Sequence, residues 1–330
     1  MSIIYSLLAV VALVLIAMIG VGALDLHLLF GIILPYAALL TFVVGFIYRV
    51  IKWACAPVPF HVPTVCGQEK TLPWIKPNNV ESPHSTLGVI ARMALEILLF
   101  RSLFRNQRVE LKRSEKLVYG GSKYLWLGSL AFHWSLLIIL FRHVRLFAEP
   151  VPSPVLFVQG IDGVFRFAVP TLYITDLVIV AALTYLFLRR VIYPQMRFIS
   201  LASDHFAVVL VLGVVLSGVL MRNFYKADIV AAKQLTMGLL TFSPVVPEGL
   251  GLPFYIHLFL VSVLLAFFPF SKLMHVVGVF LSPTRNLKNN SRMVRHINPW
   301  SYPVKVHTYE EYEDEFRDVM KEVGLPLEKE

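Results

Sequence analysis

Long apolar runs alternate with shorter charged segments along most of the chain. A bilayer core about 30 Å thick takes roughly 20 residues of helix to cross, and six runs approach or exceed that length. They cover residues 3–24, 28–48, 124–141, 167–188, 205–221 and 249–271. We expect the last run to continue as a helix past Lys272 to about Leu281. The pattern predicts an all-α polytopic membrane helix bundle with about six transmembrane helices.

The segments between these runs divide the chain into four regions. We expect two N-terminal transmembrane helices, a cytoplasmic or interfacial insertion, a transmembrane bundle that carries the chemistry and a short cytoplasmic tail. These regions are residues 1–50, 51–123, 124–282 and 283–330, in that order.

Two further helices are predicted outside the apolar runs. Residues 86–104 have helical periodicity with Arg92 and Glu96 on one face, which indicates an amphipathic helix in the membrane interface. The alternative is a seventh span, which would place both charges at membrane depth. In the tail, Thr308 and Glu311 have the spacing of a capping box before a helix over 309–324 whose aromatic and aliphatic residues share one stripe.

Composition supports a membrane protein and argues against a soluble enzyme or a nucleic-acid-binding domain. The chain is 57% hydrophobic, only 15% is charged, and its mean hydropathy is +0.70, whereas soluble domains carry about 25% charged residues. Of the 30 lysines and arginines, 24 fall in the segments on one side of the six predicted spans. By the positive-inside rule both termini are cytoplasmic. Cys55 and Cys66 are too few for a disulfide framework.

Histidines inside predicted spans point to the chemistry, because ionisable residues at membrane depth are costly and usually functional. His133 and His143 lie in the third span, and His257 and His275 lie in the sixth. The two spans are antiparallel, so His143 would face His257 near the outer side and His133 would face His275 near the inner side. A continuous helix would place His257 and His275 on one face, since 18 residues make five turns.

Two imidazoles that face each other across a bundle are the axial ligands of a six-coordinate haem b. The sequence therefore predicts two bis-histidine haems, held by His143–His257 and His133–His275. Arg142 and Arg145 beside the outer pair, and Lys272 beside the inner pair, are candidates to bind haem propionates; interfacial anchoring is their alternative role. Pro269 is expected to bend the sixth helix between its two ligands.

Two helices resemble those of a known family. The segments AFHWSLLIILFRHVRLFAEP (131–150) and YIHLFLVSVLLAFFPFSKLMHVVGV (255–279) are similar to the two ligand-bearing helices of the gamma subunit of respiratory nitrate reductase. VPFHVPTVCGQEKTLPWIK (58–76) and RMALEILLFRSLFRN (92–106) resemble the DsrM subfamily of dissimilatory sulfur metabolism. The resemblance implies a dihaem cytochrome b that exchanges electrons between menaquinone and a cytoplasmic iron–sulfur partner like DsrK, as one subunit of a larger membrane complex.

The chain departs from the nitrate reductase pattern in three places. It has an additional N-terminal span, Arg142 replaces the family's glycine, and the outer loop 149–170 has Arg166 as its only base where the family uses a lysine. The quinone site is therefore open. Asp176, Asp162 and Arg166 are candidates; Asp176 could take quinol protons or stabilise the start of its own helix.

Two other functions remain open from the sequence. A transporter would use the four histidines as a proton relay, although the spans show no internal repeat. A cofactor-free scaffold subunit would leave the paired histidines to coincidence. His61, Cys55 and Cys66 could contact a partner subunit but form no metal-binding motif.

Overall fold

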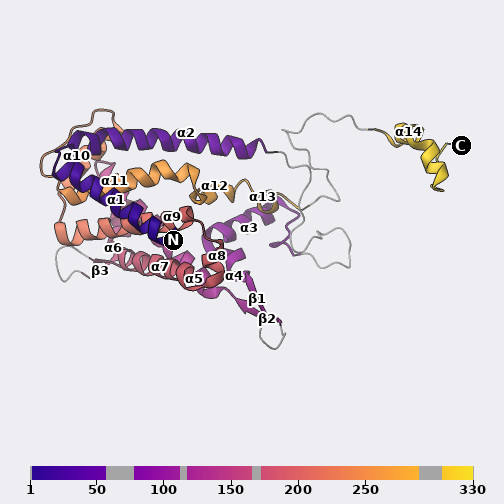
Figure 1. The fold of residues 1–330 in the computed structure, drawn as a ribbon, viewed down its shortest axis with the longest axis horizontal. Helices are drawn as coiled ribbons and strands as arrows, with labels where there is room; N and C mark the ends of the chain where they lie inside the picture. Colours follow the sequence, from indigo (N-terminus) through magenta and orange to yellow (C-terminus); the bar gives the residue numbers. More distant parts are fainter. Residues whose placement is uncertain (1, 57–77, 112–116, 166–171, 290–306, 330) are drawn as a thin grey trace.

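The computed structural model describes residues 2–56, 78–111, 117–165, 172–289 and 307–329. The long helices lie roughly alongside one another in one bundle, and a C-terminal helix lies apart from it (Figure 1). The expected all-α membrane architecture is confirmed.

Five helical stretches of the described residues are long and apolar enough to cross a membrane. They are α1 (Ser2–Gly22), η1 with α2 (Leu29–Ile33 and Leu34–Ala54), α5 with η2 (Lys123–His143 and Val144–Leu146), α9 with η3 (Ala202–Leu220 and Met221–Tyr225) and α11 with η4 (Leu252–Phe267 and Phe268–Phe270). The remaining predicted span, the fourth along the chain, is helix α7 (Ile174–Ile192), which begins seven residues later than expected. Asp176 lies in its first turn and Arg189 and Arg190 in its last, so its middle is apolar between charged ends.

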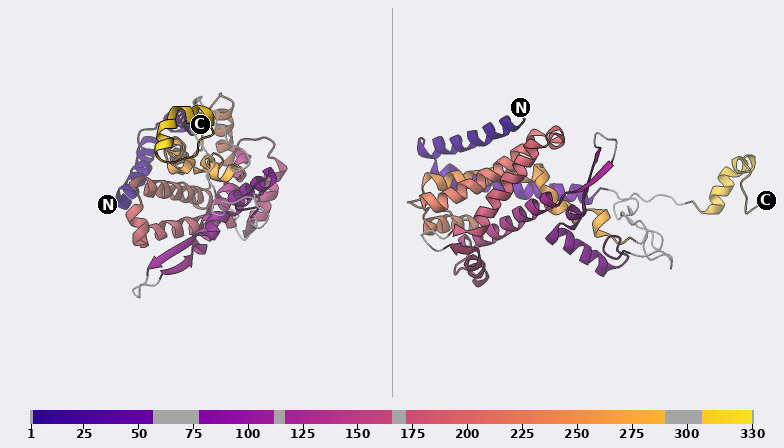
Figure 2. Two further views of the ribbon diagram at one scale, coloured as in Figure 1. Left: turned by 90° about the vertical axis from the view of Figure 1, so that its right-hand side faces the viewer. Right: turned by 90° about the horizontal axis from the view of Figure 1, so that it is seen from below.

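The helices of the bundle pack as a row of neighbours. α5 packs on α7, α7 on α9, α9 on α11 and α11 on α2, while α1 covers both α9 and α11; two further views of the bundle are given in Figure 2. Within the described residues α5 and α11 make no extensive backbone contact with each other. The two histidine-bearing helices are therefore linked through the intervening pair α7 and α9.

Small residues allow close approach at several of these crossings. A Cβ atom at Gly20 of α1 would lie 2.3 Å from the ring of the buried Phe30, and a Cβ at Gly128 of α5 would lie 2.6 Å from Tyr185 of α7. Apolar cores form between these helices: Ile179, Leu183 and Val211 are buried where α7 meets α9, and aliphatic and aromatic residues of α5 pack against them.

The sixth span is broken, which corrects the prediction of one helix to about Leu281. α11 ends at Phe267, a 3₁₀ turn with Pro269 follows, and Ser271 is extended (φ −115°, ψ 175°). The chain then resumes as η5 (Lys272–Met274) and the short helix α12 (His275–Gly278). His257 and His275 are therefore not on one continuous helix face, because Pro269 gives no backbone donor and Ser271 leaves the helical conformation.

The remaining elements are short and lie mainly at the two ends of the bundle. The helices are α3 (Thr86–Leu99), α4 (Arg101–Arg105), α6 (Ser153–Asp162), α8 (Pro194–Ile199), α10 (Ile229–Leu240) and α13 (Pro283–Asn286). Two antiparallel hairpins are formed by β1 (Gln107–Leu111) with β2 (Leu117–Gly121) and by β3 (Gly163–Phe165) with β4 (Leu172–Tyr173).

The predicted amphipathic helix is present as α3 and α4, which are separated by Phe100 in the left-handed conformation (φ 51°). Two indole nitrogens of α5 bind its C-terminal carbonyls: Trp126 donates to Leu99 O at 2.7 Å and Trp134 to Leu98 O at 3.0 Å. An ion pair between Glu96 of α3 and Arg285 also attaches the insertion to α13. The insertion is thus attached to both histidine-bearing segments of the chain.

The predicted tail helix is α14 (Tyr309–Glu322), and its capping box between Thr308 and Glu311 is formed. Glu313 is almost fully buried because it accepts hydrogen bonds from the backbone of Glu328 (2.7 Å) and Lys329 (3.0 Å). The last residues therefore fold back over one side of α14 and leave an exposed apolar stripe. The stripe consists of Tyr309, Tyr312, Phe316, Val319 and Val323.

Candidate functional site

The four histidines of the predicted spans lie at two levels of the bundle. His143 is the last residue of α5 and His257 lies in the second turn of α11, whereas His133 lies in the middle of α5 and His275 begins α12. We call the two regions the His143 end and the His275 end. His133 and His257 are half-buried, and His143 and His275 are exposed.

Each histidine has a histidine of the other segment nearby. The rings of His133 and His275 have centroids 5.9 Å apart and planes at 82°. His143 and His257 are within electrostatic range of each other. His275 reaches His133 even though the helix is broken, because α12 restarts in a position that returns it toward α5.

The Nδ1 atoms of the four histidines are all engaged by neighbouring acceptors. His133 Nδ1 lies 2.8 Å from Ser129 O, His143 Nδ1 lies 2.7 Å from Ile139 O, and His275 Nδ1 lies 2.8 Å from Lys272 O. A carbonyl oxygen can only accept, so Nδ1 carries the proton in each ring. In the neutral form of each ring Nε2 is then unprotonated and is the nitrogen that can bind a metal ion.

His257 reaches the same tautomer by a different contact. Its Nδ1 lies 3.0 Å from Ser217 Oγ of α9, and that hydroxyl donates its proton to Val214 O at 2.9 Å. The hydroxyl can therefore only accept from His257, which places the proton on Nδ1. Metal-binding histidines commonly donate their second ring N–H in this way, which fixes the tautomer and orients the ring.

The ring separation of one histidine pair is that of two imidazoles bound to a single metal ion. An imidazole nitrogen binds a metal ion at about 2 Å, so two rings on opposite sides of one ion have centroids about 6 Å apart; the His133–His275 pair is at 5.9 Å. α5 and α11 make no extensive backbone contact with each other in the described part of the chain, which is compatible with a group bound between them. No cluster of three or more histidine, cysteine or acidic side chains is present among the described residues.

Aromatic side chains surround the ring of His133. Phe132 of α5 lies 4.8 Å from it and Phe100 of the insertion lies 5.0 Å from it, both in edge-to-face geometry. The insertion therefore helps to shield this ring.

Buried charges form a compact cluster at the His143 end. Arg142 is 8% exposed and pairs with Asp176 (Nη2–Oδ1 2.7 Å) and Asp162 (Nε–Oδ2 3.2 Å). Its guanidinium carbon lies 3.8 Å from the ring centre of Tyr173, and that of Arg222 lies 3.9 Å from the same ring. The sequence brought Arg142, Asp162 and Asp176 forward separately, and the structure joins them in this Arg142 cluster.

Asp162 also determines how α7 begins. Its carboxylate accepts from Thr175 N at 3.0 Å and from Thr175 Oγ1 at 2.6 Å, so Asp162 caps the helix from the end of α6. Asp176, whose alternative role was to stabilise its own helix start, lies in the first turn and directs its carboxylate to Arg142. Tyr173 and Thr175 were not predicted, because neither has a distinguishing sequence pattern.

The other predicted residues have separate surroundings. Lys272 is exposed and pairs with the buried Asp204 at 2.9 Å, and Arg145 donates to Gln159 Oε1 at 3.0 Å. Arg166, His61 and Cys66 lie outside the described residues, and Cys55 is exposed.

His205, in the first turn of α9, is a further buried histidine that belongs to neither pair. It is 0% exposed, and neither ring nitrogen has a hydrogen-bond partner among the described residues.

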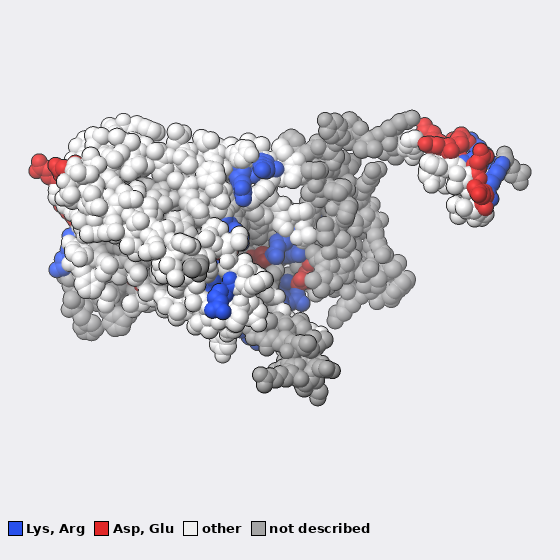
Figure 3. Space-filling model, in the orientation of Figure 1, with Lys and Arg blue, Asp and Glu red and all other residues white. Residues whose placement is uncertain are grey.

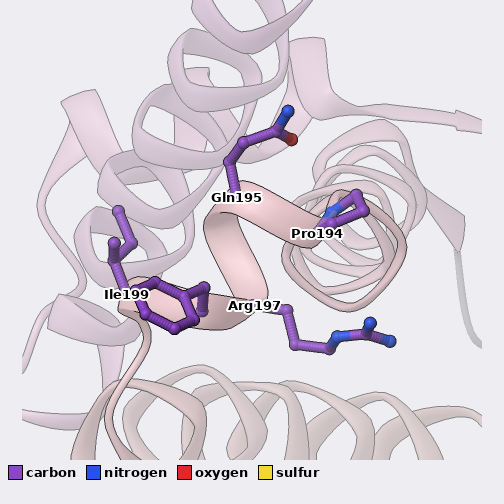
Figure 4. Close-up of a pocket in the computed structure, with 5 residues that line it drawn as sticks. Pro194, Gln195, Arg197 and Ile199 are labelled. Carbon is purple, nitrogen blue, oxygen red and sulfur yellow. The ribbon is translucent and has the colours of Figure 1, made fainter.

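A shallow groove on α8, formed by Pro194, Gln195, Arg197, Phe198 and Ile199 (Figure 4), includes none of the four paired histidines.

Charge is distributed unevenly over the bundle. In Figure 3 the visible lysine and arginine side chains gather mainly toward the end where α3 and α8 lie, while the flank between the ends is nearly free of charge. Such a flank is typical of a surface that faces lipid.

Comparison with known proteins places the chain in a family. Residues 84–296 match the family described as the nitrate reductase gamma subunit. A protein of Archaeoglobus fulgidus named Hdr-like menaquinol oxidoreductase cytochrome b-like subunit is 46% identical over 280 residues, which cover 82% of this chain and 83% of that protein. A protein of the same name from Archaeoglobus profundus is 39% identical over 81% of each chain. The chain therefore belongs to the nitrate reductase gamma subunit family of membrane proteins.

Proposed function

We propose that this chain is a dihaem cytochrome b subunit that exchanges electrons between menaquinone and a cytoplasmic iron–sulfur subunit of a membrane complex. Family membership and the names of the two Archaeoglobus relatives support a quinone-linked cytochrome b. The finer assignment, a DsrM-like subunit of sulfur metabolism with a DsrK-like partner, is supported by the resemblance of residues 58–76 and 92–106.

One observation carries the proposal: four histidines from two segments approach in pairs, and each has its Nδ1 engaged so that Nε2 is the available ligand. In this proposal His143 and His257 hold one haem b, and His133 and His275 hold the second. A coincidental set of histidines would not need one common tautomer. Haem b supplies reversible one-electron transfer at its iron; the chain supplies the ligands, their orientation and the surrounding polarity.

The cations near the histidines differ in how they could serve haem propionates. Arg142 is paired with two carboxylates and Lys272 with one, so much of their charge is already balanced. Arg145 donates a hydrogen bond to the neutral side chain of Gln159. Of the three, Arg145 keeps the most positive charge for a propionate, and Arg142 and Lys272 contribute by holding the ends of the helices in place.

We place the quinone at the His143 end, next to the Arg142 cluster. A quinone site must exchange protons as well as electrons, and Asp162 and Asp176 are buried carboxylates whose charges are held by Arg142. Their oxygen atoms are the candidate proton acceptors. Arg166, in the adjoining loop outside the described residues, remains a third candidate.

The His275 end is the proposed cytoplasmic side, with both termini on it. The insertion, α13 and the start of the C-terminal segment meet there, and the lysine and arginine bias of the sequence favours that side. α14 carries the exposed apolar stripe on a helix whose segment 310–330 has nine acids and three bases. An acidic amphipathic helix is repelled by anionic lipid headgroups, so we assign this face to the soluble partner subunit.

The test is the reduced-minus-oxidised spectrum of the purified protein and of single histidine variants. His143→Ala or His257→Ala should remove one haem and leave the other, and His133→Ala or His275→Ala should remove the second. His27→Ala is the matched control, because His27 contacts Tyr255 and Asp25 and belongs to neither pair. Retention of both haems in all four ligand variants would exclude the assignment, and a protein that never binds haem would favour the transporter or scaffold alternatives.

A further inference from the structure

One of the four paired histidines is oriented by a different helix from its own. His133, His143 and His275 direct Nδ1 to a backbone carbonyl three or four residues earlier in their own segment. His257 of α11 instead directs Nδ1 to two acceptors of α9, the Ser217 hydroxyl and the Val214 backbone carbonyl. Its ring position therefore depends on how α9 and α11 pack, and a side-chain substitution can remove the contact.

Ser217 is fixed in the acceptor role by its own hydrogen bond. Its Oγ donates to Val214 O at 2.9 Å, within the same helix, and lies 3.0 Å from His257 Nδ1. Because the single hydroxyl proton is used toward Val214, a lone pair of Oγ faces the imidazole N–H. Serine is one of the residues that form hydrogen bonds between membrane helices.

The next residue makes room for this contact. A Cβ atom at Gly218 would lie 3.1 Å from Cε1 of His257 and 3.5 Å from its Nδ1. The glycine thus lets the imidazole lie against the backbone of α9, at the distance that the Ser217 hydroxyl requires. Two adjacent residues of α9, one that binds the ring and one that leaves space for it, form a cradle for His257.

We propose that Ser217 is a positioning residue for the haem held by His143 and His257, and that Gly218 provides the space that this role needs. The proposal rests on the proposed function. An imidazole that donates Nδ1–H to an acceptor is a more basic ligand and is held in one orientation. A more basic ligand stabilises the ferric state, so the Ser217 contact lowers the reduction potential of this haem relative to the same site without it.

The test is a redox titration with optical detection, together with the low-spin ferric EPR signal of the purified protein. Ser217→Ala should raise the midpoint potential of the haem at the His143 end and broaden its EPR signal, while the other haem is unchanged. Ser217→Thr keeps the hydroxyl and should restore both properties. Gly218→Ala should reproduce the Ser217→Ala effect, because the added methyl group displaces the ring from the hydroxyl.

Ser262→Ala is the matched control. Ser262 is a buried serine of α11 whose hydroxyl donates to Leu258 O at 2.8 Å and, among the described residues, makes no hydrogen bond to a histidine. Its loss should leave both potentials unchanged. An equal shift of the midpoint potential in Ser262→Ala and Ser217→Ala would show that the effect is a general loss of packing, and this would overturn the proposal.

The positioning role of Ser217 and the ligand role of His257 can be tested separately. If His257→Ala loses one haem but Ser217→Ala leaves its potential and EPR signal as in the wild type, the positioning role is wrong and the ligand assignment stands; the Val214 carbonyl would then suffice as acceptor. If His257→Ala retains both haems, the proposed function itself is wrong.

Discussion

Replacing Arg142 by methionine should be among the most destabilising single substitutions at the His143 end. The substitution keeps much of the side-chain length but removes the charge between Asp162 and Asp176. The side chains of the three residues are 9%, 5% and 11% exposed, in the order Arg142, Asp162, Asp176. Water therefore cannot replace the lost partner. Removing one partner of a buried ion pair costs about 3–5 kcal/mol, and the stacking on Tyr173 is lost as well.

The assay is equilibrium unfolding in mixed micelles with increasing SDS, followed by circular dichroism. Arg142→Met should lose about 3–5 kcal/mol, whereas Arg145→Met, which loses a hydrogen bond to the neutral Gln159, should lose about 1 kcal/mol. Arg142→Lys should lie between them, because lysine keeps the charge but cannot bind two carboxylates and stack at once. Adding Asp176→Asn to Arg142→Met should recover part of the loss, since one unpaired carboxylate is removed. Equal stability of Arg142→Met and Arg145→Met would refute the view that this cluster is a buried ion-pair network.

Two further predictions concern the packing of α1 on η1 and the docked insertion. Gly20→Ala should lower the free energy of unfolding by about 1–3 kcal/mol, because its Cβ would lie 2.3 Å from the ring of Phe30. Gly160→Ala, where the Cβ has open space, should leave the free energy of unfolding unchanged or slightly raised. Unfolding in SDS measures both variants, and equal effects would contradict the close approach of α1 to η1. Burial raises the pKa of Glu81, but the hydrogen bond from Arg101 and the charges of Arg101, Arg105 and Arg92 outweigh it and hold that pKa below the ordinary 4.5. A depressed folded pKa means that the ion pairs stabilise the docked insertion above pH 4.5 and that this stability is lost as pH falls through the folded pKa. Acrylamide quenching of Trp126 and Trp134 should therefore increase on acidification, and Glu81→Gln should show increased quenching already at neutral pH. Equal quenching of the wild type and Glu81→Gln at every pH would contradict this role of Glu81.

Hydrophobic pattern was sufficient to predict the helices but not their interruptions. The lengths of the apolar runs predicted α1, α2, α5, α9 and α11 because a bilayer dictates both length and composition. The break at Ser271 was predicted only as a bend at Pro269. A proline in a membrane helix can kink it or end it, and the outcome depends on whether neighbouring elements accept the freed backbone groups. In this protein Ser271 does so locally, since its hydroxyl accepts from Leu273 N and donates to Phe268 O.

The candidate site was predictable to the extent that it depends on spacing. His133, His143, His257 and His275 stand out because histidine is rare inside apolar runs, and antiparallel helices imply which of them meet. The contacts that orient them depend on tertiary packing. Ser217 is an ordinary small residue in an apolar run, and only the crossing of α9 and α11 brings it to His257. Likewise Arg142 was predicted as a propionate ligand or an interfacial anchor, whereas its two carboxylate partners come from α6 and α7.

The most direct test of the whole account is the haem content of the purified wild-type chain, measured by the pyridine haemochrome method against protein concentration. Paired ligation by four histidines predicts two haems b per chain. A colourless protein, or one haem per chain in fully loaded preparations, would contradict the assignment of His143–His257 and His133–His275 as two axial pairs.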